Sequence, residues 1–245
     1  MEVTTNNIGQ PKYLTLAILF ALVYPTLLTY VYFVYLIDAE RSLQHLVYGG
    51  GKILQFGFPL FWVWGVAKNR PRLTRPSRDG LLPGLLFGLV VAGGMWALYY
   101  LWLAPAGVMD AAAGPVREKV ASFGIDNVWT YAAFGLFYTL AHSLAEEYYW
   151  RWFVFAQATR VMSVPLANVV SSLGFTAHHV ILLGTFFGYD NPVSWIFAAA
   201  IAVGGSVWAW MYHRYGSLYP VWLSHGLVDA AIFSIGYHMV RDLLV

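Results

Sequence analysis

Ionisable side chains lie on three hydrophobic segments in the second half of the sequence, and their types suit acid–base or metal chemistry. The runs HSLAEEYYWR, FTAHH and HGLVD supply His142, Glu146, Glu147, Arg151, His178, His179, His225 and Asp229. An ionisable group at membrane depth is costly, and by default it faces the interior of a bundle and marks a function. We therefore expect these side chains to point inward and to carry the chemistry.

Helical spacing gives the side chains of the first run different roles. Residues four apart share a face of a helix, whereas neighbours point about 100° apart. Glu147 should pair with Arg151 and be unavailable as a proton carrier, whereas Glu146 has no cation close to it in sequence. The spacing predicts Glu146 as the catalytic acid or base, with Glu147 and Arg151 as support. His142 shares a face with Glu146 and could orient it.

The other two runs add imidazoles and a third carboxylate. His225 and Asp229 are four apart and converge on one side of a helix, where they could ligate a metal, polarise a carbonyl or form an acid–base pair. Only one of His178 and His179 can face a given partner. Phe175 shares a face with His179, so we expect a functional His179 packed on Phe175, with His178 at a side interface.

Each motif also has a purely structural explanation. A single membrane histidine is often only an interhelical hydrogen-bond donor, and a Glu–Arg pair can simply join two helices. Three such motifs on three separate segments, all supplying Glu, His or Asp, favour a shared functional site.

The composition requires these runs to sit in membrane helices. The 245 residues are 59% hydrophobic and only 11% charged, with a mean hydropathy of +0.59. Soluble domains carry about 25% charged residues, and disorder needs low hydrophobicity and high charge. The composition therefore predicts an all-α polytopic transmembrane helical bundle. A net charge of +2 does not favour a nucleic-acid partner, and the absence of cysteine excludes a disulfide framework.

Hydrophobic runs of about 20 residues can cross a bilayer. The sequence predicts seven spans, or eight if the long run 128–157 breaks, at residues 13–37, 46–67, 81–109, 128–157, 165–187, 191–212 and 220–240. Lys52 is the one charge in the second span, and we expect it to snorkel from near the helix start. We treat residues 1–245 as a single integral-membrane domain, with residues 128–240 as its catalytic helices.

The loops and span ends predict how the bundle lies in the membrane. The basic segment 68–78 (KNRPRLTRPSR) should be cytoplasmic, together with the N-terminus, as in a bacterial or archaeal type of plasma membrane protein. Tyr and Trp residues near span ends, Trp208 among them, are typical of an interfacial aromatic belt. Gly84 and Gly88 suit close helix packing, and residues 104–127 form the main extramembrane segment.

The same charged residues resemble the motifs of a known family. Glu-Glu-x-x-x-Arg (Glu146, Glu147, Arg151), Phe-x-x-x-His (Phe175, His179) and His-x-x-x-Asn/Asp (His225, Asp229) follow one another on successive hydrophobic segments. This ordered set resembles the CAAX prenyl protease and bacteriocin-processing (CPBP, or Abi) family of intramembrane endopeptidases. The resemblance covers about residues 128–230.

The resemblance implies a helical-bundle peptidase whose site opens towards the cytoplasm. Glu146 and His179 would activate a water molecule, and His225 with position 229 would stabilise the oxyanion or complete a metal site. The prenyl protease branch typically has Asn where this chain has Asp229, and an ionised carboxylate cannot donate to an oxyanion. This difference slightly favours a divalent metal such as zinc held by His179, His225 and Asp229, and the glutamate-based mechanism remains the alternative.

The leading hypothesis is therefore an intramembrane endopeptidase that cleaves a membrane-associated protein or peptide near the cytoplasmic face. Two alternatives stay open. The first is a non-catalytic membrane chaperone or bacteriocin-immunity-type binding protein on the same scaffold. The second is a proton-coupled transporter, which would be expected to show internal repeats of broken helices.

Overall fold

The structure is a computed structural model that describes residues 13–68 and 78–244. Within these ranges every regular element is a helix and no strand occurs, which confirms the predicted all-α class. Most of the basic segment 68–78, which carries the prediction of a cytoplasmic loop, lies outside the described residues.

The N-terminal half contains three long helices that each end in wider, π-helical turns. They are α1 (Leu14–Tyr30) with η1 (Val31–Tyr35), α2 (Arg41–Leu60) with η2 (Phe61–Val66), and α3 (Leu81–Leu98) with η4 (Tyr99–Leu103), the last preceded by the short 3₁₀ turn η3 (Arg78–Gly80). A further helix, α4 (Asp110–Ser122), lies in the segment predicted to be extramembrane.

One continuous helix runs from residue 128 to residue 158 and carries the first charged run. Its parts are α5 (Val128–Phe137), η5 (Tyr138–His142), α6 (Ser143–Glu147), η6 (Tyr148–Phe155) and α7 (Ala156–Ala158). The start is well defined, because the Asn127 side chain accepts hydrogen bonds from the backbone N–H groups of Trp129 and Thr130. The long run therefore forms one unbroken helix, and the choice between seven and eight spans stays a prediction.

Three more helices complete the chain: α8 (Val164–Phe187), α9 (Pro192–Tyr215) and α10 (Tyr219–Val240), followed by the short η7 (Arg241–Leu243). Each has a proline in its first turn, where the missing N–H has no helical partner to lose. Gly216 ends α9 in the left-handed conformation, with φ of 60°, which glycine adopts without steric cost.

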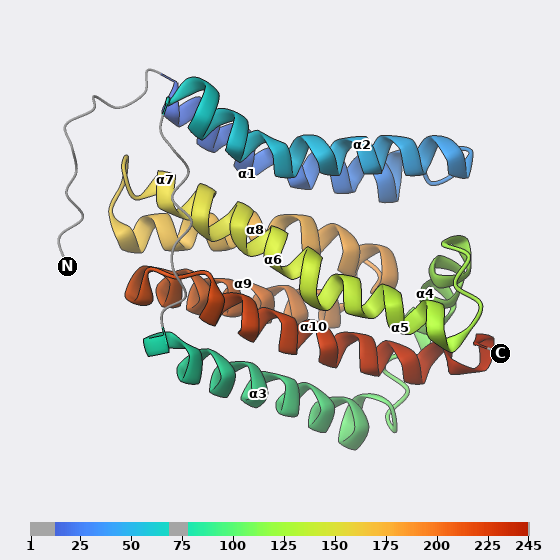
Figure 1. Ribbon diagram of the computed structural model, residues 1–245. Coiled ribbons are helices and arrows are strands. Elements are labelled where there is room, and N and C mark those ends of the chain that lie inside the picture. Colours follow the sequence, from blue (N-terminus) through green and yellow to red (C-terminus); the bar gives the residue numbers. More distant parts are fainter. Residues whose placement is uncertain (1–12, 69–77, 245) are drawn as a thin grey trace.

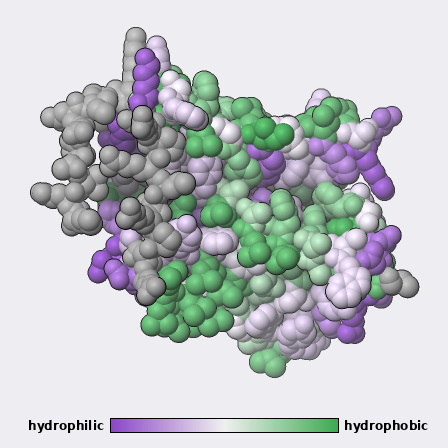
Figure 2. Space-filling view, in the orientation of Figure 1, coloured by the Kyte–Doolittle hydropathy of each residue, from purple (hydrophilic) through white to green (hydrophobic). Residues whose placement is uncertain are grey.

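Among the residues that the structure describes, four helices are long and apolar enough to cross a membrane: Leu14–Tyr35, Leu81–Leu103, Val164–Phe187 and Pro192–Tyr215. The other three predicted spans coincide with α2, the long helix and α10, which are not among these four helices. Figure 2 shows hydrophobic side chains over the middle of the visible face and hydrophilic ones towards its two ends. The protein is an integral membrane protein, and the total of seven spans stays a prediction.

The helices lie in successive layers (Figure 1), from the pair α1 and α2 at one edge to α3 at the other. α8 packs along α9, and α10 packs along α3. Glycine allows the close approaches around α10. A Cβ atom at Gly84 would collide with the Pro220 carbonyl, one at Gly88 would lie 3.0 Å from Cα of Ser224, and one at Gly226 would lie 2.8 Å from the Thr139 carbonyl oxygen. The predicted close packing at Gly84 and Gly88 is confirmed.

Candidate functional site

Side chains from three helices meet in the interior of the bundle. The long helix contributes Glu146, Glu147 and Arg151, α8 contributes its adjacent histidines, and α10 contributes His225. These groups lie next to the main hydrophobic core, which includes Trp150, Phe175 and Trp208.

Glu147 joins the long helix to α10. Its Oε1 accepts a hydrogen bond from Nδ1 of His225 at 2.6 Å, and its Oε2 lies 3.1 Å from Nε of Arg151. Arg151 also donates from Nη2 to the Gly205 carbonyl of α9 at 3.3 Å. The ion pair predicted from the four-residue spacing is confirmed. The bond to His225 was not predicted, because 78 residues separate the two partners.

Aromatic rings hold this charged group in place. The Arg151 guanidinium lies 4.7 Å from the ring centre of Phe175 and 5.2 Å from that of Trp208. Trp208 stacks on the His225 ring at 4.3 Å and donates from its indole nitrogen to the hydroxyl of Ser224. Trp208 is therefore a buried part of the site, and its assignment to the interfacial aromatic belt was wrong. Position near a span end does not reveal which face of the helix is covered.

Glu146 lies between imidazoles from two other helices. Its Oε1 is 3.5 Å from Nε2 of His178, and its Oε2 is 3.8 Å from Nε2 of His225. Both separations exceed the usual 2.7–3.2 Å of an N–H···O hydrogen bond. In the described part of the chain, no Lys or Arg nitrogen lies within 4 Å of the Glu146 carboxylate. Asp229 approaches the same edge of His225, with Oδ1 3.6 Å from Nε2.

The two adjacent histidines of α8 are placed differently from the expectation. His178 is buried, stacks parallel to Trp150 and approaches Glu146, so its expected position at a side interface was wrong. His179 packs on Phe175 as expected, with ring centres 4.6 Å apart, and its Nδ1 lies 2.8 Å from the Phe175 carbonyl oxygen. The rings of both histidines are 4.1 Å apart, so the side chains of neighbouring residues border one site despite their different directions from the helix axis.

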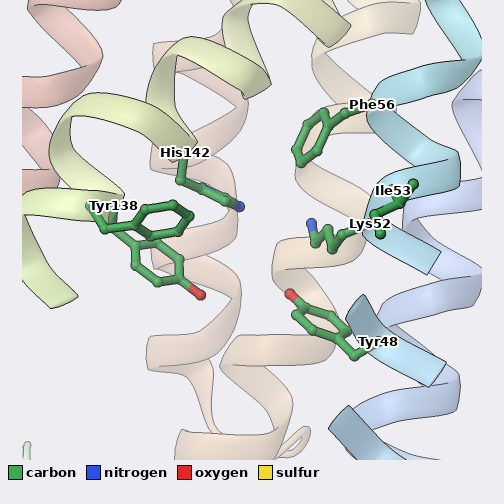
Figure 3. Close-up of a pocket in the computed structure, with 7 residues that line it drawn as sticks. Tyr48, Lys52, Ile53, Phe56, Tyr138 and His142 are labelled. Carbon is green, nitrogen blue, oxygen red and sulfur yellow. The ribbon is translucent and has the colours of Figure 1, made fainter. Parts of the chain in front are cut away.

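A cavity of about 350 Å³ lies between α2 and the long helix. Its lining is mostly apolar but includes the polar groups of four side chains, those of Tyr48, Lys52, Tyr138 and His142. The other lining residues are Ile53, Phe56 and Phe137. Figure 3 shows the Lys52 amine and the Tyr48 hydroxyl facing the His142 ring and the Tyr138 hydroxyl across this space.

The cavity lies near the helical turn that carries Glu146. One of its polar residues, His142, is four residues before Glu146 on the long helix. His142 was expected to orient Glu146; it lies in the cavity wall, with its ring 4.6 Å from that of Tyr138. Lys52 was expected to snorkel from the helix start; it lies in the middle of α2 and points into the cavity.

In the structure, the side chains of His179, His225 and Asp229, the predicted zinc ligands, are not arranged as a metal site. Among the residues that the structure describes, no group of three or more His, Asp or Glu side chains is arranged to hold a metal ion. One nitrogen of His179 is already directed at a backbone carbonyl, and the free edge of His225 faces two carboxylates. A metal held by His179, His225 and Asp229 stays a prediction, and no chemical step below depends on it.

Comparison with protein families gives a match to the second half of the chain. Residues 128–231 match the family described as type II CAAX prenyl endopeptidase Rce1-like. This range contains Glu146, His178, His179, His225 and Asp229, and it agrees with the extent of the resemblance inferred from the motifs. No curated protein and no solved structure gives a significant match to the chain.

Proposed function

We propose that the protein is an intramembrane endopeptidase, on the premise that residues 128–231 match the Rce1-like family. It hydrolyses a peptide bond of a membrane-associated protein or peptide near the cytoplasmic face. The observation that carries this proposal is the Glu146 carboxylate, which lies between His178 and His225 from two other helices. A carboxylate flanked by imidazoles can accept a proton from water in such a site.

The proposed reaction is a direct hydrolysis. Glu146, assisted by His179, accepts a proton from a water molecule, and the water oxygen forms a bond to the carbonyl carbon of the scissile amide. The C–N bond then breaks, and the proton returns to the amide nitrogen, which leaves as an amine while the other product becomes a carboxylic acid. His178, facing Oε1 of Glu146, orients the carboxylate during both proton transfers.

His225 is the proposed donor to the oxyanion. Its Nδ1 is held by Glu147 at 2.6 Å, so its Nε2 is directed to the side where Glu146 and Asp229 lie. In the doubly protonated ring, Nε2–H can donate to a negatively charged oxygen. Asp229 then acts as a counter-charge for the imidazolium, a role that a carboxylate fills without being a donor itself. Glu147, Arg151 and Trp208 are positioning residues that act through His225.

Cleavage by the purified protein tests the proposal. The probes are a farnesylated fluorogenic peptide with a CAAX-type end and the same peptide without the farnesyl group. We expect cleavage of at least one probe by the wild type and by Glu118→Gln, which removes an exposed carboxylate on α4. Glu146→Gln should reduce the rate by at least about a hundredfold, the usual contribution of a general base. Full activity of folded Glu146→Gln would reject the assignment.

Elemental analysis of the same preparation separates the two mechanisms that the motifs allow. A stoichiometric amount of zinc that is lost in His225→Ala would support the metal set of His179, His225 and Asp229. Protein that is active and free of zinc would support the glutamate-based reaction written above.

The burial of these side chains favours a second function, that of a non-catalytic chaperone or immunity-type binding protein. Glu146 is only 3% exposed and His225 only 4%, as expected if these residues hold the scaffold together. In that case neither probe is cleaved, and Glu146→Gln retains the biological activity of the protein wherever it still folds. The peptide assay therefore distinguishes the two functions.

A further inference from the structure

A second cavity, of about 310 Å³, lies between α10, the long helix and α3, and the proposed mechanism does not use it. Thr139 and Leu140 of the long helix and Leu81 of α3 form two of its walls, and one face of α10, from Tyr219 to Ala230, forms the third. The lining presents only apolar atoms to this space. Tyr219, at one end, is 37% exposed, so the cavity is a groove that opens to the outside of the bundle. We call it the α10 groove.

The α10 groove has the length of one leaflet of a membrane. Its lining extends eleven residues along α10, from Tyr219 in the first turn to Ala230, and at 1.5 Å per residue this is about 17 Å. The hydrocarbon core of a bilayer is about 30 Å thick, so one leaflet contributes about 15 Å. Because α10 begins at Tyr219, the groove runs from a span end towards the middle of the membrane. It therefore fits one hydrocarbon chain that enters from the interface.

Cations lie at the end of the groove where such a chain would carry its headgroup. Arg214 is exposed, and its guanidinium lies 5.6 Å from the ring centre of Tyr215. Tyr215 in turn packs on Gly80, where a Cβ atom would lie 2.7 Å from its ring, and Gly80 directly precedes the lining residue Leu81. The basic segment 68–78, with five basic residues and no acid, ends at the same place in the chain. Among the described residues, no carboxylate lies within 4 Å of the Arg214 guanidinium.

The groove also borders the contact between α10 and the long helix. The Trp222 indole, in its wall, donates to the Leu140 carbonyl at 2.9 Å and packs against the Tyr219 ring. Trp and Tyr side chains are typical of the interfacial region of a membrane. A chain bound in the groove would contact both helices, which together hold His225 against Glu147.

We propose that the α10 groove binds one anionic phospholipid, with an acyl chain along the apolar walls and the phosphate beside Arg214. Basic sites at the ends of membrane helices bind anionic headgroups in this way. If the basic segment 68–78 is cytoplasmic, the lipid belongs to the cytoplasmic leaflet, where anionic lipids are found. The bound lipid braces α10 against the long helix and so supports the position of His225.

Native mass spectrometry of the purified protein tests this proposal. The probes are palmitoyl-oleoyl phosphatidylglycerol and the phosphatidylcholine with the same chains. For the wild type we expect a Kd at least about tenfold lower for phosphatidylglycerol, the size of effect typical of a hydrogen bond to a charged group. Arg214→Gln should remove this preference by weakening the binding of phosphatidylglycerol alone. The matched control Arg160→Gln, which removes an exposed cation in the turn after α7, should behave as the wild type.

Ala230→Phe tests the apolar walls, because the larger side chain fills the end of the groove that is farthest from Arg214. We expect weaker binding of both lipids, whereas Ala199→Phe on the exposed face of α9 should have no effect. The exposed position of Arg214 keeps the headgroup test independent of whether Ala230→Phe folds.

A phosphatidylglycerol with a diazirine in its acyl chain locates the site. After irradiation, peptide mapping should find the adduct on α10 between Trp222 and Ala230 or at Leu140, and Ala230→Phe should remove it. Neither experiment involves cleavage, so both can succeed even if the protein is not an endopeptidase.

Four outcomes would overturn the proposal. Equal Kd values for the two lipids in the wild type would show that the headgroup is not recognised. Adducts spread over lipid-facing helices such as α1 would show only the general lipid layer. Displacement of the lipid by a farnesylated peptide, with no lipid retained, would assign the groove to the prenyl chain of a substrate. A lipid-free dimer that Ala230→Phe converts to a monomer would show that a second copy of the chain fills the groove.

Discussion

At the scale of residues, the site is organised around the two edges of His225. One edge is fixed by Glu147, which Arg151 holds in turn, and the other faces Glu146 and Asp229. The neighbouring carboxylates therefore have different tasks: Glu147 has close partners at both of its oxygens, whereas the neighbours of Glu146 are 3.5 Å or more away. Neither oxygen of Glu146 is therefore held as closely by another side chain as Oε1 of Glu147 is by His225.

Glu147→Gln should lower stability more than Glu146→Gln does. The substitution leaves the buried Arg151 guanidinium without its carboxylate, and breaking one side of a buried ion pair costs about 3–5 kcal/mol. Thermal unfolding in detergent, monitored for both variants and for the exposed control Glu118→Gln, measures the difference. A midpoint for Glu147→Gln equal to that of the wild type would show that the ion pair does not support the fold.

The two histidines of α8 can be separated by substitution. His178→Phe keeps a ring that can stack on Trp150 but removes the nitrogen that faces Glu146. We expect a rate about tenfold lower, with an unchanged unfolding midpoint, because only the orientation of Glu146 is lost. His179→Ala should lower the rate by about a hundredfold or more, as expected for a group that takes part in proton transfer. The reverse order of effects would assign the direct role to His178.

At the scale of elements, α10 positions His225 in the site because glycines allow this helix to lie close to α3 and to the long helix. Gly84 and Gly88 admit the backbone of α10 against α3, and Gly226, next to His225, admits the Thr139 carbonyl of the long helix. His225 reaches Glu147 only if α10 keeps this position. The spacing of glycines in α3 is therefore part of the functional site, although no atom of α3 belongs to it.

Gly84→Ala tests this packing. The new Cβ would collide with the Pro220 carbonyl, and overpacking of this kind costs about 1–3 kcal/mol. The matched control is Gly93→Ala in the same helix, where a Cβ meets nothing within 4 Å. The control should be neutral or stabilising by up to about 1 kcal/mol, since alanine favours the helix. Equal unfolding midpoints for both variants would show that α3 and α10 are not tightly packed.

At the scale of the whole molecule, the helix ends agree with a chain that crosses the membrane repeatedly. α4 and the C-terminal turn lie at the same end, joined by the 2.8 Å ion pair of Arg117 and Asp242. The turn between α7 and α8 lies at the other end (Figure 1). If the basic segment 68–78 is cytoplasmic, as expected from its charge, α4 and the C-terminus are on the outer side.

Single-cysteine labelling tests this orientation directly, because the natural sequence contains no cysteine. In intact bacterial cells, Glu118→Cys on α4 should react with a membrane-impermeant maleimide, whereas His213→Cys at the exposed end of α9 should react only after permeabilisation. The opposite pattern would place the N-terminus outside and move the site towards the outer face.

The sequence predicts the helices well and the site in part. Hydrophobic length locates every long helix, and the four-residue rule finds the pair of Glu147 and Arg151. Contacts between distant segments carry no local signal, so the bond from Glu147 to His225 and the stacking of Trp208 on that ring emerge only from the tertiary structure. The same holds for Lys52, whose position within a span gives no indication of a cavity on one side of it.

The most direct test of the central claim is peptide cleavage in water enriched in ¹⁸O, followed by mass spectrometry of both fragments. We expect the wild type to release an N-terminal fragment with one ¹⁸O atom in its new carboxylate. Glu146→Gln with a wild-type unfolding midpoint should release no labelled fragment in the same time. Labelled product formed at an undiminished rate by folded Glu146→Gln would contradict the account, because water would then be activated without this carboxylate.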